Sequence, residues 1–342
     1  MKIDLRSDTV TLPTSEMLES MMQAEVGDDV YDEDPTVNAL QEKAAEMFGM
    51  EAGLFCPSGT MCNQIAIRVS TKPQDHLICD QYAHVHLYEG GGIAYNSMVS
   101  STLVAGDRMR MTPQQIREAI YPDDVHYPQT RLVCLENSCN KGGGSYYTLK
   151  QIKEIAQLCE DYELKLHLDG ARVFNALVAS GDDATGYGEC FDTISVCLSK
   201  GLGAPVGSVL LGSEETILAA KRVRKVLGGG MRQAGYLAAA GVYALDHHIE
   251  RLEEDHARAR MIGGVLSSQA WVKDVMPVDT NIICFKPQKA AMAIPKVLAY
   301  LKEHDIHASR FGKEYIRMVT HLDIADEMAL KVCEVVAAYP GS

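Results

Sequence analysis

The sequence predicts an α/β protein with a mostly parallel β-sheet covered by helices, followed by a smaller α+β lobe. Two observations support this prediction. Short apolar runs alternate with segments of helical periodicity over the first two thirds of the chain, which is the pattern of strand–helix–strand units. Polar residues of catalytic type follow some of these runs, at the place where open α/β sheets bind ligands. We expect an N-terminal arm and a large domain over residues 1–250 and a small C-terminal domain over residues 251–342.

Six apolar runs are the predicted strands of the sheet, and helical patterns separate them. In residues 36–48, Val37, Leu40, Ala44 and Phe48 share one helical face, and Gly49 follows as a stop signal. Strands this continuously apolar require cover on both faces of a sheet. The predicted strands are residues 53–56, 76–80, 131–136, 164–169, 193–198 and 208–211.

The last third of the chain has a different order of elements. Residues 234–267 are helical in pattern and lead to a predicted strand at 279–285, a helix at 291–304 and a strand at 315–319. This order predicts a small α+β lobe of roughly 90 residues, a usual size for a small domain.

Composition limits the kind of partner. The chain has 342 residues, is 46% hydrophobic, and carries 46 acidic against 32 basic residues for a net charge of −14. This charge disfavours nucleic acid and anionic membrane surfaces, and no stretch is long enough to span a bilayer. Ten cysteines fall mostly in apolar runs without a CxxC pair, which indicates buried thiols in a reducing compartment. We therefore expect a cytoplasmic protein with a small-molecule substrate.

Lys200 follows the predicted strand at 193–198 and precedes a glycine-rich turn at 201–208. A lysine at a strand end is partly desolvated, which favours the neutral amine and makes it a candidate Schiff-base former with a carbonyl cofactor or substrate. The alternative is a lysine whose stem is buried and whose ammonium pairs with a carboxylate. Lys200 alone does not favour either of these two interpretations.

Asp169 ends the predicted strand at 164–169 and separates the two interpretations of Lys200. Pyridoxal phosphate (PLP) chemistry requires a lysine and also a carboxylate that faces the pyridine nitrogen, because only a protonated ring withdraws electrons well. Alone, such an aspartate is a helix cap or a metal ligand. As a pair, Asp169 and Lys200 predict PLP.

A phosphate site is predicted where Ser58, Gly59 and Thr60 connect a short strand to a helix. This order directs backbone N–H groups, a hydroxyl and the helix dipole toward one point, which suits an anion. The signal is weak, because the same residues serve as an ordinary helix cap. The turn is neither a Walker loop nor GxGxxG, which disfavours nucleotide binding.

Eight short motifs follow one another in order along the chain, at residues 4–11, 29–36, 57–60, 135–137, 167–172, 198–207, 228–235 and 317–323. Together they resemble the threonine aldolases, members of the β-eliminating lyase group of PLP enzymes with the aspartate-aminotransferase fold (fold type I). The chain departs from the family at Asp32, where the family often has glycine.

The resemblance implies roles for two histidines. His84 stacks on the pyridine ring and His126 lies near the substrate β-hydroxyl, and either histidine or a water molecule held by them takes the hydroxyl proton. Without the resemblance, His84 and His86 are a weak metal-binding pattern with no evident third ligand, and His126 is an ordinary loop histidine. We predict no metal.

The resemblance also implies how substrate and cofactor are held. Arg172 and Arg317 bind the substrate carboxylate through planar guanidinium groups, with Ser7 as a further donor. For each arginine a structural salt bridge is the alternative, and Arg310 competes for the role of Arg317. Arg172 also belongs to the cofactor-binding set.

A third group acts between subunits in the family. Lys225 and Arg232 reach a neighbouring subunit's cofactor phosphate, and Tyr31 forms part of a wall across the interface. The expected assembly is a homodimer or homotetramer.

The expected activity is cleavage of L-threonine, L-allo-threonine or related β-hydroxy-α-amino acids to glycine and an aldehyde. The enzymatic alternative is β-elimination or transamination on the same fold. The non-enzymatic alternative is a PLP-binding carrier that keeps Lys200 but does not turn over substrate.

Overall fold

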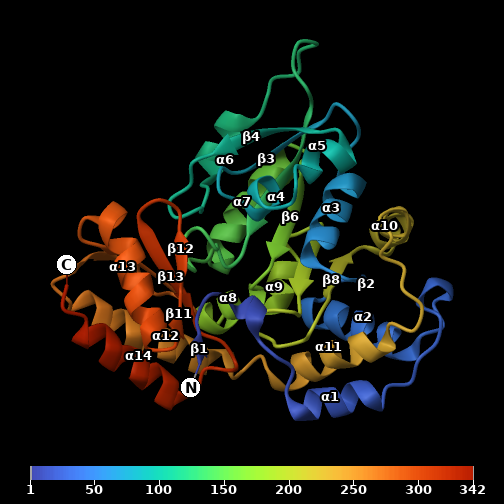
Figure 1. Cartoon of the computed structure of the whole chain (residues 1–342). Coiled ribbons are helices and arrows are strands. Elements are labelled where there is room, and N and C mark those ends of the chain that lie inside the picture. The colour runs from blue at the N-terminus through green and yellow to red at the C-terminus, as the bar shows by residue number, and fades with distance from the viewer. Residues whose placement is uncertain (1, 342) are drawn as a thin grey trace.

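The structure is a computed structural model and describes residues 2–341. Its centre is a seven-stranded sheet in the order β2-β8-β7-β6-β5-β3-β4 (Figure 1). The strands pair in parallel except that β8 runs antiparallel to both β7 and β2. The strands are β2 Ala52–Cys56, β3 His76–Asp80, β4 Ser100–Val104, β5 Thr130–Glu136, β6 Lys165–Gly170, β7 Thr193–Cys197 and β8 Ser208–Gly212.

The six predicted strands are confirmed, and the mostly parallel sheet with them. Strand β4 was not predicted. It lies at the edge of the sheet, pairs only with β3, and is partly exposed along its whole length. Its sequence Ser-Ser-Thr-Leu-Val therefore lacks the continuous apolar run of a buried strand.

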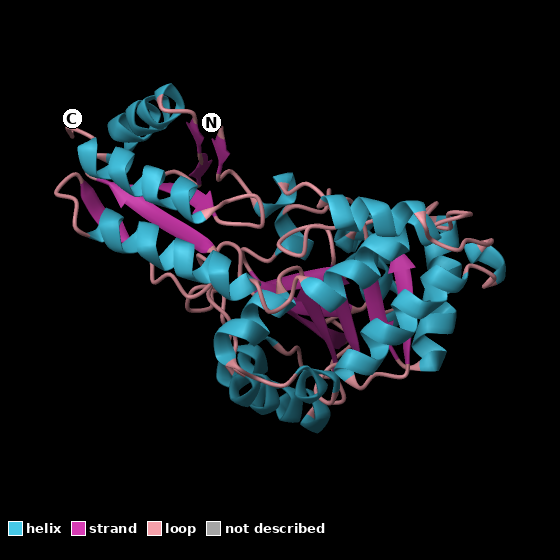
Figure 2. Cartoon of the chain, turned by 90° about the horizontal axis from the view of Figure 1, so that it is seen from below, coloured by secondary structure: helices cyan, strands magenta, loops and turns pink. Residues whose placement is uncertain are grey.

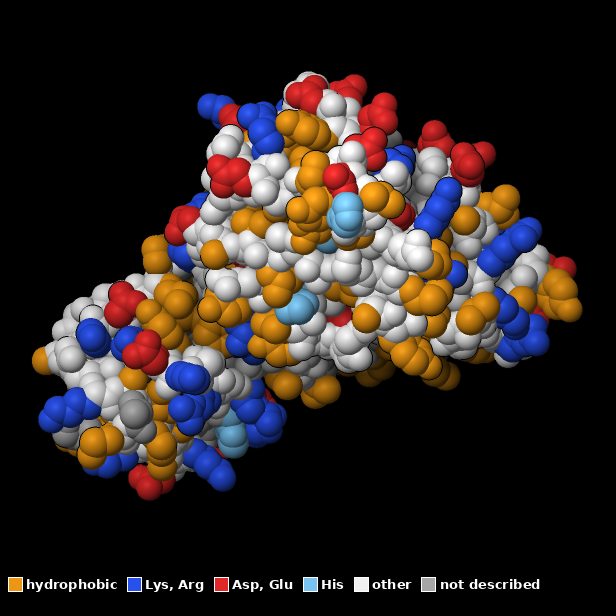
Figure 3. All heavy atoms as spheres, turned by 90° about the horizontal axis from the view of Figure 1, so that it is seen from above, with side chains coloured by type: hydrophobic (Ala, Val, Ile, Leu, Met, Phe, Trp, Pro, Cys, Tyr) orange, Lys and Arg blue, Asp and Glu red, His pale blue; other side chains and the backbone are white. Residues whose placement is uncertain are grey.

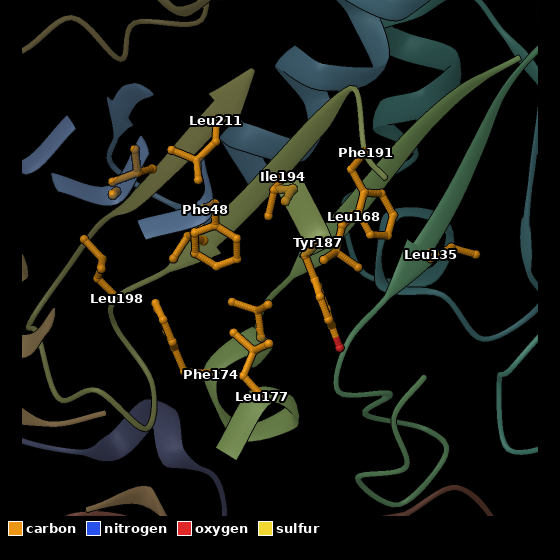
Figure 4. Close-up of a cluster of buried hydrophobic side chains, with 14 of the residues drawn as sticks. Phe48, Leu135, Leu168, Phe174, Leu177, Tyr187, Phe191, Ile194, Leu198 and Leu211 are labelled. Atoms are coloured by element: carbon orange, nitrogen blue, oxygen red, sulfur yellow. The ribbon is translucent and has the colours of Figure 1, made fainter. Parts of the chain in front are cut away.

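Helices cover both faces of this sheet (Figure 2). Phe48, Phe174, Tyr187 and Ile194 meet in the main hydrophobic core (Figure 4). The helices before the C-terminal lobe are α1 Ser15–Met22, α2 Pro35–Phe48, α3 Gly59–Ser70, α4 His84–Leu87, α5 Gly92–Ser97, α6 Pro113–Ala119, α7 Leu149–Asp161, α8 Val173–Ser180, α9 Ala184–Gly188, α10 Glu214–Val226 and α11 Gly235–His247.

Local signals explain the ends of α2. The Asp34 carboxylate accepts the N–H of Val37 at 3.0 Å, and Pro35 takes the first helical position. Gly49 ends the helix with φ 63°, in the left-handed region that glycine enters without a steric penalty. The predicted helix at 36–48 is thus confirmed.

The C-terminal lobe has its own sheet and core. Four antiparallel strands in the order β12-β13-β10-β9 pack with α12, α13 and α14, as Figure 2 shows. The predicted α+β character is confirmed. The elements are α12 Leu252–Ser267, β9 Val272–Val275, β10 Ile282–Pro287, α13 Ala290–Glu303, β11 Ile306–His307, β12 Ser309–Phe311, β13 Tyr315–Val319 and α14 Asp326–Ala338.

The N-terminal segment belongs structurally to this lobe. Strand β1, Ile3–Asp4, pairs in parallel with β11. Ile3 and Leu5 are buried in the hydrophobic core of the lobe. The predicted boundary at residues 250 and 251 falls between α11 and α12, and the division into two domains stays a prediction.

The helical stretch expected over 234–267 is two helices rather than one. It breaks at residues 248–251, where the chain leaves the main core and enters the C-terminal lobe. The second helix starts with Glu253, Glu254 and Asp255 in its first turn. Acidic residues favour a helix N-terminus, so this cluster was a signal for the break. Within residues 2–341, no helix is both long and apolar enough to cross a membrane.

Candidate functional site

A pocket of about 450 Å³ lies between the carboxyl ends of the central strands and the C-terminal lobe. His84, Glu136 and Lys200 line it from the large body, and Phe311 and Arg317 line it from the lobe. Strands of a parallel sheet end at one edge, so residues distant in sequence converge there. The other lining residues are Ser7, Thr9, Tyr88, Asn140, Lys141, Ala171, Arg172, Ser309 and Arg310.

Lys200 lies in this pocket just beyond β7. Within residues 2–341 its ammonium makes no hydrogen bond or ion pair. The salt-bridge alternative for Lys200 therefore has no partner among the described residues, and the amine remains available to a ligand.

Asp169 lies on β6, which pairs with β7, the strand before Lys200. Only one of its two carboxylate oxygens has a hydrogen-bond partner in the described part of the chain. Oδ1 accepts the backbone N–H of Ala171 at 3.1 Å. Oδ2 is buried without a partner, and the residue is only 4% exposed. A buried acceptor without a donor is costly, so this oxygen fits a ligand that brings an N–H, such as a protonated pyridine ring.

His84 begins α4, next to Asp169. Its Nδ1 lies 2.8 Å from Oε1 of Glu89. Burial lowers the pKa of His84, but the hydrogen bond to Glu89 and the charges of Asp169, Glu89 and Glu136 outweigh burial, so the pKa of His84 is raised.

Glu89 orients this imidazole through that hydrogen bond and was not among the predicted site residues. Its carboxylate is also bonded to the side-chain amides of Asn63 and Gln64, at 2.8 and 2.6 Å. His84, Glu89 and Asp169 each place one possible metal ligand within 4.8 Å of the others. The hydrogen bond between Glu89 and His84 accounts for the closeness of those two side chains.

Arg317 reaches the pocket from β13. Its Nη1 donates to Oδ1 of Asn140 at 2.6 Å and its Nη2 donates to the carbonyl of Arg6 at 3.1 Å. Its Nε is buried without a partner, and burial lowers the pKa of the guanidinium. A buried unsatisfied donor in a pocket suits a carboxylate ligand.

Arg172 forms a buried salt bridge with Asp8, which was the alternative considered for it. Nε and Nη2 donate to the two carboxylate oxygens of Asp8 at 2.6 and 2.8 Å. Burial raises the pKa of Asp8, but Arg172 outweighs this effect and holds the pKa at about 2. Nη1 of Arg172 makes no hydrogen bond inside the described range 2–341, so one edge of the guanidinium stays available.

Ser7 and Arg310 lie at the same pocket with different surroundings. Ser7 Oγ accepts the Thr9 hydroxyl at 2.9 Å. Arg310 is exposed, and its guanidinium donates to the carbonyls of Gly312 and Lys313 in its own loop. The choice between Arg310 and Arg317 for a substrate carboxylate stays a prediction.

The turn at 58–60 caps α3. Ser58 Oγ accepts the Met61 N–H at 3.2 Å, as the ordinary cap interpretation expects. Gly59 and Thr60 begin the helix. None of the three lines the pocket of Lys200, and their role as a phosphate site stays a prediction.

Four further predicted residues lie away from this pocket within one chain. His126 lies on an exposed loop, its side chain 84% exposed, and its Nδ1 contacts Asp124 at 2.7 Å. Tyr31 is 71% exposed, and Arg232 is paired with Asp28 at 2.8 Å. Lys225 lines a separate pocket of about 350 Å³ with Val30 and Asp32. Their functional roles stay predictions.

Asp32, the departure from the family motif, has φ 60°. This is the left-handed conformation that glycine adopts readily and that aspartate tolerates better than most residues. The loop therefore keeps a glycine-like backbone at this position.

The sequence profile of the family described as Beta-eliminating lyase matches residues 4–290. The chain belongs to the β-eliminating lyase family. It is 42% identical over 332 residues to the low specificity L-threonine aldolase of Escherichia coli (strain K12), covering 96% of this chain and 97% of that relative. It is 40% identical over 328 residues to low-specificity L-threonine aldolase 1 of Arabidopsis thaliana, covering 94% of this chain and 92% of that relative.

The solved structures confirm the fold of this family. The threonine aldolase of Leishmania major superposes with a TM-score of 0.84 and 19% identity, covering 98% of both chains. Serine palmitoyltransferase of Sphingomonas wittichii superposes with a TM-score of 0.77 and 14% identity, covering 98% of this chain and 86% of that chain. The predicted resemblance and fold class are both confirmed.

Proposed function

We propose that this member of the β-eliminating lyase family is a PLP-dependent threonine aldolase. It cleaves L-threonine, L-allo-threonine or related β-hydroxy-α-amino acids to glycine and an aldehyde. The observation that carries the proposal is a buried, unpartnered acceptor, Asp169 Oδ2, close to His84, together with an unpaired ammonium, that of Lys200, in the pocket that His84 also lines. The two relatives named as L-threonine aldolases, which match nearly the whole chain, support the reaction type.

The residues present fit PLP. Lys200 would offer an amine to its aldehyde, Asp169 Oδ2 would accept the N–H of its ring, and His84 would offer an aromatic face. When bound, PLP supplies an electron sink for the electron pair released when the Cα–Cβ bond breaks. Ser58, Gly59 and Thr60 are the proposed phosphate contacts within the chain, because they begin α3.

Two arginines orient the substrate in this proposal. Arg317 binds the carboxylate with its free Nε, and Arg172 contributes the guanidinium edge that Asp8 leaves free. Ser7 donates a further hydrogen bond. Fixing the carboxylate and the amine restricts rotation about Cα, and this restriction selects the bond that breaks.

A base must take the proton of the β-hydroxyl. The imidazole of His84 is a suitable base in the pocket, because its Nδ1 is bound to Glu89 and its Nε2 remains free for a hydroxyl or a water molecule. His126 is the other proposed partner of the hydroxyl. Because His126 lies on an exposed loop outside the pocket of its own chain, we propose that it acts at the pocket of another subunit.

We further propose a homodimer or homotetramer in the cytoplasm. Lys225, Arg232 and Tyr31 act on a neighbour's site, which agrees with their position away from Lys200. Hydrophobic side chains are exposed at many separate places on the surface seen in Figure 3, and Tyr95 and Val125 are among the most exposed of the described residues. The ten free cysteines, mostly buried, agree with a reducing compartment.

The test is product analysis with PLP-loaded enzyme. L-Threonine and L-allo-threonine are supplied without a keto acid, and glycine and acetaldehyde are measured together. Equal amounts of both products support the aldolase. Formation of 2-oxobutyrate and ammonia assigns β-elimination instead, and turnover only with an added keto acid assigns transamination.

A further inference from the structure

We propose that Glu136 is a positioning residue that fixes two sides of the pocket at once: His84 by a direct hydrogen bond, and Arg317 through Asn140. The consequence for substrate binding rests on the proposed function above. The sequence motif at 135–137 does not by itself indicate that Glu136 positions His84 and Arg317. The carboxylate can position both residues without contacting the substrate.

The two oxygens of Glu136 point in different directions. Oε2 accepts the backbone N–H of His84 at 2.8 Å, and Oε1 accepts the backbone N–H of Asn140 at 2.8 Å. The residue ends β5, an internal strand between β3 and β6, and is only 5% exposed. A rigid strand therefore holds one carboxylate between two loops.

The first bond fixes the start of α4. This helix has four residues and no side-chain cap of its own. Glu136 satisfies the N–H of its first residue, His84, as an N-cap side chain would. The bond fixes the backbone of His84, whose imidazole lies close to Asp169, to strand β5.

The second bond reaches the C-terminal lobe. Asn140, held by its backbone N–H, accepts Arg317 Nη1 through its side-chain oxygen at 2.6 Å. Arg317 lies on β13 of the other sheet. The guanidinium from one lobe is therefore fixed by two hydrogen bonds in series to a strand of the other.

Holding both loops requires that each of the two terminal atoms of the side chain accept a hydrogen bond. A carboxyl group provides two acceptor oxygens, whereas glutamine provides one oxygen and one NH₂ donor. In Glu136→Gln one backbone N–H faces a donor, so one of the two bonds is lost while side-chain volume is kept. This makes Glu136→Gln the appropriate variant.

The measured quantities are PLP affinity by absorbance and glycine affinity of the PLP-loaded protein by spectral titration. We expect Glu136→Gln to bind glycine about tenfold more weakly, as expected for a lost hydrogen bond to a charged group. The matched control is Asp80→Asn. Asp80 also ends a strand, is buried, and accepts two backbone N–H groups at 2.8 and 2.9 Å, but it does not line the pocket. It must lose thermal stability without the tenfold loss of glycine affinity.

A double-mutant cycle tests the route through Asn140. Asn140→Ala must weaken glycine binding, and adding Glu136→Gln must weaken it little further, because both changes release Arg317. Fully additive effects, or an unchanged glycine affinity in Glu136→Gln, overturn the proposal.

If Glu136→Gln does not fold, Asn140→Ala alone tests the proposal. Unchanged glycine affinity in Asn140→Ala overturns the proposal. Weakened glycine affinity with normal PLP binding supports it. Glycine affinity is measured without aldol cleavage. If the PLP-loaded protein does not cleave L-threonine, this test remains readable, because it needs bound PLP and glycine but no cleavage.

Discussion

Asp8 and Arg172 form a bidentate ion pair, at 2.6 and 2.8 Å, in which both side chains are almost fully buried. Asp8 comes from the N-terminal segment and Arg172 follows the central strand β6. The pair therefore links the N-terminal segment, which packs with the C-terminal lobe, to the carboxyl end of β6 at the pocket. It also fixes which edge of the guanidinium can face the pocket.

Removing Asp8 leaves the buried charge of Arg172 without its partner. We expect Asp8→Ala to lower the free energy of unfolding by about 3–5 kcal/mol, the usual cost of breaking a buried pair. The check is chemical denaturation at neutral pH. The exposed pair of Lys331 and Glu334 is the control, because Glu334→Ala removes a surface salt bridge and should change stability by less than about 1 kcal/mol. Equal losses in the two variants contradict this prediction.

Lys200 is the amine expected to hold the cofactor. Lys200→Ala should therefore lose the visible absorption of bound PLP and the borohydride-reducible lysine adduct. Lys141→Ala is the matched control, because Lys141 lines the same pocket and its ammonium lies 4.0 Å from the Phe311 ring centroid. A reducible adduct that persists in Lys200→Ala moves the cofactor to another lysine.

Asp169→Asn separates cofactor binding from turnover. The amide keeps the size of the side chain but removes the charge that stabilises a protonated ring nitrogen. We expect PLP to remain bound and kcat to fall at least about a hundredfold, within the range typical of lost electrostatic stabilisation. The measurements are absorbance and steady-state kinetics, and near-wild-type turnover would remove Asp169 from this role.

Much of the fold and part of the site were predictable because their signals are local. Apolar runs identified six strands, and Lys200 and Asp169 stand directly at strand ends. The edge strand β4 was missed because its exposure weakens that signal. Glu89, Asp8 and Asn140 were missed as partners because side-chain bonds between distant segments leave no local pattern. Asp8 and Arg172, for example, are 164 positions apart.

Glu136 predicts a pH dependence of stability in the PLP-free protein. Burial and the nearby charge of Asp169 raise its pKa from 4.5 to about 7, although two backbone hydrogen bonds and His84 oppose the shift. The folded state then binds a proton more tightly than the unfolded state. The stability from this proton is complete below pH 4.5 and is lost as the pH rises to about 7.

This loss is on the order of 3 kcal/mol. Thermal unfolding of wild type and Glu136→Gln at pH 5 and pH 8 checks it. The decrease in melting temperature between these values should be smaller in the variant, and an identical decrease contradicts the assignment to Glu136.

Arg317→Lys replaces a planar fork by a point charge. The ammonium cannot reproduce the hydrogen bonds to Asn140 and Arg6 while facing a carboxylate. We expect KM for L-allo-threonine to rise at least about tenfold with a smaller effect on kcat. Arg310→Lys is the control at the same pocket and should leave KM nearly unchanged. The reverse result assigns the carboxylate to Arg310.

Subunit mixing tests whether Arg232 acts on a neighbour's site. Arg232→Ala should retain PLP poorly, and Lys200→Ala should be inactive. In a hybrid dimer with shared sites, one site carries both substitutions and the other carries neither. Random exchange of equal amounts should therefore restore about a quarter of wild-type activity in a two-fold dimer. Activity is measured at limiting PLP after subunit exchange has been verified with differently tagged chains. Exchange without recovered activity would place Lys200 and Arg232 at the same site within one chain.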